Sequence, residues 1–94
     1  MYTVSVSTPS RTAMVDITHR ISDVVQKSGV KNGVCMIFVP HTTAGVTINE
    51  NADPDVVRDI IKETNKVIPF DDNYSHMEGN SAAHIKTTLT GSSV

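Results

Sequence analysis

Three of the four histidines occupy positions at which an imidazole could take part in chemistry. His41 directly follows an apolar run expected to form a strand, which would hold its backbone rigidly. His76 lies in a polar loop ahead of the last expected helix, and His84 lies one turn into that helix. Three converging imidazoles are the usual way to hold a catalytic Zn²⁺ with one position open to water or substrate. His76 and His84 are not an i, i+4 pair, so the spacing alone favours the alternative of separate histidines in ordinary loop and capping hydrogen bonds.

Two other side chains near these histidines need separate treatment. Glu78 follows His76 in the same loop, where its carboxylate could be a fourth metal ligand, a partner of a ligating histidine, or a general base. His19, beside Arg20, falls outside the apolar stripe of its expected helix, so we predict a solvated surface residue.

The residues around the start of the last expected helix could also bind an anion. Small side chains in residues 79–83 leave the first free amides of the helix approachable, and such a helix end accepts phosphate or carboxylate. The hydroxyl groups of Thr42, Thr43 and Ser81 could add hydrogen bonds. In the alternative interpretation, Gly79 serves only a turn and Asn80 only a helix cap.

Four segments are expected to be strands that position these residues. Residues 2–7 and 13–17 alternate between polar and apolar side chains with period two, which predicts a hairpin. Residues 34–39 form an unbroken apolar run, typical of a strand covered on both faces. Residues 45–49 alternate again, and the short connection between the last two segments favours an antiparallel pair.

Three helices are expected from caps and apolar stripes. They run from a Thr18 cap to Gly29, from an Asp53 cap with Pro54 behind it to Pro69, and from an Asn80 cap through Leu89 to Gly91. The buried stripe of the second helix is expected to comprise Val56, Val57, Ile60, Ile61 and Val67. The order ββα-ββ-αα predicts a single α+β domain over residues 1–94.

Composition narrows the class of protein. The 94 residues are rich in valine, isoleucine and threonine, which favours strands over a helical bundle. A net charge of −2 and only two Phe and two Tyr argue against a nucleic-acid binder, and no apolar stretch is long enough to span a membrane. The single cysteine, Cys35, lies in an apolar run, where we expect a buried, inert thiol. A single cysteine cannot form a disulfide within the chain, which fits a reducing compartment, so we expect a cytoplasmic location.

Two long motifs, residues 41–56 and 76–86, resemble the YjbQ family, also labelled secondary thiamine-phosphate synthase. The resemblance covers all 94 residues. It implies an α+β domain that assembles as a homotrimer, with a site near the subunit interface. Members of the family continue past the last residue of this chain through further strands that carry a Gly-Thr-Trp-Gln motif and a late arginine. This chain lacks them, so part of the family's site is expected to be missing.

The resemblance also implies which residues form the site. His41, His76 and His84 would hold a divalent metal (Zn, Mn, Ni or Mg), with Glu78 and Asn80 nearby. Glu78 and His41 are the expected catalytic residues. Together with the hydroxyl groups of Thr42, Thr43 and Ser81 singled out above for anion binding, Asn80 is expected to bind the small phosphorylated substrate.

Two hypotheses of function follow. In the first, the protein joins a pyrimidine diphosphate to a thiazole phosphate, giving thiamine phosphate and pyrophosphate, as the family label implies. A metal-dependent reaction on another phosphorylated metabolite is a variant of this hypothesis. In the second, the protein is a non-catalytic trimer that binds a metal ion or small anion. Restored growth of a thiamine auxotroph would distinguish the first from the second.

Overall fold

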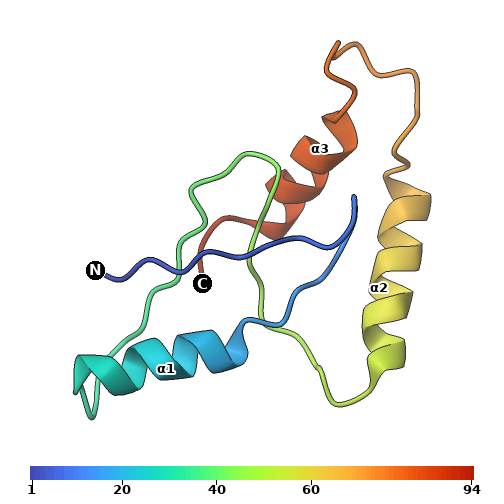
Figure 1. Cartoon of the computed structure of the whole chain (residues 1–94). Helices are drawn as coiled ribbons and strands as arrows, with labels where there is room; N and C mark the ends of the chain where they lie inside the picture. Colours follow the sequence, from blue (N-terminus) through green and yellow to red (C-terminus); the bar gives the residue numbers. More distant parts are fainter. The chain divides into compact units, whose positions relative to one another are not determined.

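Three helices joined by extended segments make up the chain (Figure 1). The structure, a computed structural model, describes residues 1–94. Residues 1–35 and residues 36–94 form two compact units. The expectation of a single domain over the whole chain stays a prediction. None of the three helices combines the length and the apolar character that crossing a bilayer requires.

The first unit contains helix α1, Thr18–Ser28. Its start differs from the prediction, because Thr18 is the first helical residue and not the cap. The carboxylate of Asp16 accepts the free amide of Thr18 at 2.9 Å, so an acidic side chain two residues earlier does the capping. Its end is as predicted: Gly29 has φ 73°, a left-handed conformation that glycine adopts without steric cost, and its N–H donates to the Gln26 carbonyl.

The second unit contains the other two helices. Helix α2 spans Pro54–Val67 and begins as predicted, since the carboxylate of Asp53 accepts the amide of Asp55 at 2.9 Å. Of its expected stripe, Val56, Val57, Ile60 and Ile61 are half-buried. Val67, however, is 68% exposed, so its assignment to the buried stripe was wrong.

The Asp53 cap carries a testable consequence for the stability of α2. Asp53→Ala leaves the amide of Asp55 without its acceptor, so we expect the unfolding free energy to fall by about 1 kcal/mol. Arg58→Ala removes only an ion pair with Asp55 whose side chains are 70% and 65% exposed, and it should cost less. Urea unfolding followed by circular dichroism measures both changes. An equal loss in the two variants would contradict the capping role.

Helix α3 spans Ser81–Thr90, one residue longer than predicted. Asn80 precedes it, but the side chain of Asn80 makes no capping hydrogen bond. Ala82 in its first turn is 1% exposed, and together with Ile68, which follows α2, it is one of the two buried apolar residues of the chain. Lys86 on α3 donates to the side chain of Asn65 on α2.

The predicted α+β fold with four strands was wrong, because the chain forms no sheet. An isolated antiparallel bridge between Phe38 and Ser93 is the only β pairing. Beside it, Ile37 and Val94 exchange two backbone hydrogen bonds of 2.8 and 3.1 Å, and the Val39 amide donates to the Ser92 carbonyl. Residues 2–7 and 13–17 form no hairpin.

The chain forms no sheet because its extended segments lack neighbouring segments to pair with, although their residue types favour extended backbone. Residue types that favour extended backbone make a strand only where a neighbouring segment accepts and donates the ladder hydrogen bonds. Residues 34–39 find such a partner only in residues 92–94. The segment 45–49 pairs with neither, and its single tertiary backbone bond runs from the Val46 amide to the Gly91 carbonyl after α3. Ile48 in this segment is 80% exposed, so no covered face forms here.

The turn after α2 places a tyrosine hydroxyl on the backbone. Tyr74 donates to the carbonyl of Pro69 at 2.6 Å, which anchors the acidic turn at residues 71–73. Partial removal from water raises the pKa of Tyr74 above 10.0, and the negative charges of Asp72 and then Asp71 raise it further.

We therefore expect Tyr74 to ionise above pH 10.0. A pKa higher in the folded than in the unfolded chain means that the neutral phenol stabilises the fold. This contribution is fully present below the unfolded pKa and is lost as pH rises through the folded pKa. The difference in tyrosinate absorbance between the protein and Tyr74→Phe isolates this group. Ionisation of Tyr74 at or below pH 10.0 would contradict the assignment.

Candidate functional site

Two of the predicted site histidines meet at the start of α3. The ring centroids of His76 and His84 are 5.5 Å apart, and the rings stand edge to face at 87°. His84 is positioned by the helix itself, since its amide donates to the Asn80 carbonyl at 3.3 Å. His76 reaches it from the preceding loop. The residues lie eight positions apart, so the reversal of the chain between them brings the rings together.

Glycine makes that reversal possible. Gly79 has φ 77°, and its amide donates to the His76 carbonyl at 3.3 Å, which closes a tight turn. The turn brings the Glu78 carboxylate to 3.8 Å from Nε2 of His76. The two side chains are 75% and 43% exposed, so water screens their attraction. Both can reach a ligand from solvent.

The polar groups around the first turn of α3 are incompletely satisfied. Oδ1 of Asn80 is buried and has no hydrogen-bond partner. The amides of Ala83 and His84 both donate to the Asn80 carbonyl. The amides of Ser81 and Ala82 lie too early in the helix to have a carbonyl acceptor within it. His76, His84, Glu78, Asn80 and Ser81 therefore form one group, called here the α3 cluster.

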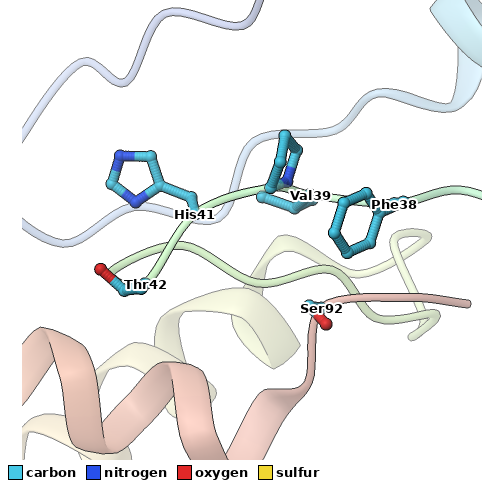
Figure 2. A pocket seen from close by; sticks show the side chains of 6 residues that line it. Phe38, Val39, His41, Thr42 and Ser92 are labelled. Atoms are coloured by element: carbon cyan, nitrogen blue, oxygen red, sulfur yellow. The ribbon is translucent and has the colours of Figure 1, made fainter.

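His41 belongs to a different part of the second unit. It follows residues 37–39, which pair with the C-terminal residues 92–94, and its Nδ1 accepts the amide of Thr43 at 3.0 Å. The Thr43 hydroxyl lies at 3.0 Å from the same nitrogen. An open pocket of about 410 Å³ lies here, lined by Phe38, Val39, Pro40, His41, Thr42 and Ser92 (Figure 2). No sequence signal pointed to Ser92 in this lining, because only the pairing of residues 37–39 with residues 92–94 brings it here.

The predicted three-histidine metal site can be compared with this geometry. No group of three or more His, Cys, Asp or Glu side chains is placed to hold one metal ion. The α3 cluster supplies two imidazoles and a carboxylate, while His41 is engaged with Thr43 in the open pocket. His41, His76 and His84 as arranged here do not form one metal centre. Binding of a divalent metal by this protein stays a prediction.

Two residues outside these groups also bear on the sequence predictions. His19 is exposed on α1, as expected for a solvated histidine. Cys35 is exposed, so the prediction of a buried thiol was wrong. The apolar run around Cys35 lacks the covering strands that the prediction assumed.

Comparison with known proteins extends this picture. Residues 2–94 match the family model described as UPF0047 protein YjbQ-like. The UPF0047 protein MJ1081 of Methanocaldococcus jannaschii is 50% identical over 99% of this chain and 67% of its own length. The UPF0047 protein YugU of Bacillus subtilis is 45% identical over 97% of this chain and 70% of its own length.

Solved structures agree with the sequence matches. A YjbQ/UPF0047 protein of Clostridium acetobutylicum is 56% identical, with a TM-score of 0.82 over 85% of this chain and 62% of that one. A YbjQ-like protein of unknown function from Sulfolobus solfataricus is 34% identical, with a TM-score of 0.88 over 95% of this chain and 65% of that one. The chain thus spans about two thirds of the length of these relatives. From the family match over 2–94 and the identities of its relatives, the chain belongs to the UPF0047 YjbQ-like family.

Proposed function

We propose that this protein acts on a small phosphorylated metabolite, with the α3 cluster as the place where a phosphate group binds. The specific reaction proposed is a thiamine-phosphate synthase-like condensation of a pyrimidine diphosphate with a thiazole phosphate. The observation that carries the proposal is the convergence of His76 and His84, whose ring centroids are 5.5 Å apart, at the start of α3.

Phosphate suits this place for three physical reasons. The first amides of a helix point outward and carry a partial positive charge, which stabilises an anion. Ser81 adds a hydroxyl group at that end of the helix. The side chains of residues 81–83 are small, so they do not block a ligand from the helix end. The imidazoles of His76 and His84 add ring N–H donors, and hydrogen bonds to an ionised acceptor are the strong ones.

The proposed reaction gives these groups defined tasks. The thiazole nitrogen attacks the methylene carbon of the pyrimidine, a C–N bond forms, and the C–O bond to the diphosphate breaks. The electron pair of that bond leaves with pyrophosphate. N–H and O–H donors at the α3 cluster stabilise the charge that develops on the departing oxygen. Glu78, 3.8 Å from Nε2 of His76, orients that ring electrostatically, and the pair must shorten to hydrogen-bond distance to exchange a proton.

Two further parts of the proposal concern assembly and cofactor. A homotrimer is expected from the family resemblance, and sedimentation of the purified protein tests it. A divalent metal is expected from the same source, and elemental analysis of protein purified without added metal tests it. We assign no step to a metal, since the three histidines are not placed together in this chain.

The test of the named reaction is direct turnover. The protein is incubated with the pyrimidine diphosphate and the thiazole phosphate, and thiamine phosphate and pyrophosphate are quantified by mass spectrometry. Formation of both products in equal amounts is expected. Pyrophosphate that binds without any turnover would favour a non-catalytic anion-binding protein, and neither binding nor turnover would remove the proposal altogether.

A further inference from the structure

The α3 cluster carries an acidic side chain where a phosphate site usually carries a basic one. Residues 76–84 contain no lysine or arginine, and Glu78 is their only acidic residue. Lys86, the next lysine along the chain, donates to the side chain of Asn65 on α2. Proteins commonly bind phosphate through arginine or lysine, whose positive charge offsets that of the ligand. Residues 76–84 provide neither.

Glu78 places a negative charge beside the proposed position of the phosphate. Its side chain is 75% exposed, so a ligand in solvent can reach the carboxylate. The neighbour at 3.8 Å is the His76 imidazole, which offsets the carboxylate only when it is protonated. Two like charges 4 Å apart in water lower an affinity by about fivefold, and two opposite charges raise it as much. A phosphate compound therefore gains affinity at this place when it also carries a positive charge within reach of Glu78.

We propose that the α3 cluster selects phosphate compounds that carry a positive charge close to the phosphate, with Glu78 as the residue that determines this specificity. The phosphate accepts from the imidazoles and from the first amides of α3, and the cationic group lies against the Glu78 carboxylate. The place of the phosphate rests on the proposed function, whereas the selectivity for a positive charge rests on the position of Glu78.

The proposed reaction forms a cation of this kind. The lone pair of the thiazole nitrogen makes the new C–N bond, and the electron pair of the broken C–O bond leaves with pyrophosphate. No proton moves, so the thiazole ring becomes positively charged while the departing oxygen becomes negatively charged. A carboxylate and several N–H donors in one cluster can stabilise these two charges of opposite sign.

Two phosphate esters that differ in charge and share a shape test the selectivity. Phosphocholine carries a trimethylammonium group, and 3,3-dimethylbutyl phosphate carries a neutral tert-butyl group in the same place. Each is titrated into the ¹⁵N-labelled protein at about pH 8, where free imidazole is neutral. We expect saturable shifts of the Ser81 and Ala82 amides and tighter binding of phosphocholine. This advantage should decrease as added salt screens the charges.

Glu78→Gln removes the charge and keeps the size of the side chain. We expect the preference for phosphocholine over the neutral ester to fall about fivefold in this variant. Glu50→Gln, at an exposed residue ahead of α2, makes the same change in net charge and should leave the preference intact. A preference that Glu78→Gln leaves unchanged, or that both variants lower equally, would overturn the inference.

Inorganic pyrophosphate separates a failure of this inference from a failure of the proposed function. Pyrophosphate that shifts the Ser81 and Ala82 amides, in a protein that does not distinguish the two esters, would overturn only the selectivity assigned to Glu78. If pyrophosphate and both esters leave these amides unshifted, the proposed function fails together with the inference.

Discussion

His76→Ala is expected to lower kcat/KM for thiamine phosphate formation by about 100-fold, the lower range for loss of a positioned acid, base or donor. The substitution removes one of the two imidazoles that meet at the start of α3 and leaves Glu78 without its 3.8 Å partner. Initial rates at several concentrations of the pyrimidine diphosphate separate an effect on KM from one on kcat.

His19→Ala is the matched control for that substitution. It removes an imidazole from the exposed face of α1 and should leave kcat/KM unchanged. Equal activity of the two variants would contradict the assignment of the α3 cluster. Circular dichroism of each variant confirms that the three helices are retained.

Gly45→Ala is expected to have the largest effect on the fold of the second unit. A Cβ atom at this position would lie 2.6 Å from the Gly91 carbonyl oxygen and 3.0 Å from Cγ2 of Thr90. The backbone after α3 would have to move away, which breaks the 3.0 Å hydrogen bond between the Val46 amide and Gly91. Overpacking of this kind costs about 1–3 kcal/mol. Faster hydrogen exchange at the Val46 amide and a lower urea midpoint are the expected observations.

Gly33→Ala provides the comparison for this clash. Its added Cβ would lie 3.3 Å from Cγ1 of Val30, a side-chain atom that can shift by a few tenths of an ångström. We expect a much smaller change in stability and no change at Val46. Similar losses in both variants would mean that the approach of Gly45 to Gly91 does not hold residues 45–46 in place.

The helices could be predicted because their signals are local. Asp53, Pro54 and Gly29 act on amides and dihedral angles within a few residues, so their roles were confirmed. The error at the start of α1 was equally local: the Asp16 carboxylate accepts the amide of Thr18, so Thr18 is already the first helical residue and not the cap. The burial of individual side chains was harder to predict than the helices. Val67 lies on the apolar stripe of α2 but is 68% exposed, because the sequence does not say which segment covers that stripe.

The strands could not be predicted because their signals are not local. Residues 34–39 have a composition suited to a covered strand, yet Val34 is 98% and Phe38 59% exposed. A ladder needs a partner at the right register, and the sequence does not say which segment supplies it. Here residues 92–94 provide a single short pairing.

The candidate site also has a part that local sequence signals predict and a part that depends on pairing between distant segments. His76, Glu78 and His84 lie within nine residues of sequence, and one glycine turn with one helix start brings them together. The association of His41 with Ser92 depends on pairing between distant segments, which the sequence alone does not indicate. Convergence of all three histidines, implied by family resemblance, is not seen in this chain.

Titration of the ¹⁵N-labelled protein with pyrophosphate, followed by NMR, tests the central claim most directly. If a phosphate group binds at the α3 cluster, the Ser81 and Ala82 amides and the His76 and His84 rings should shift together and saturate at one ligand per chain. His76→Ala should weaken that binding. Saturable shifts confined to other segments, or no shifts at these four residues, would contradict the account.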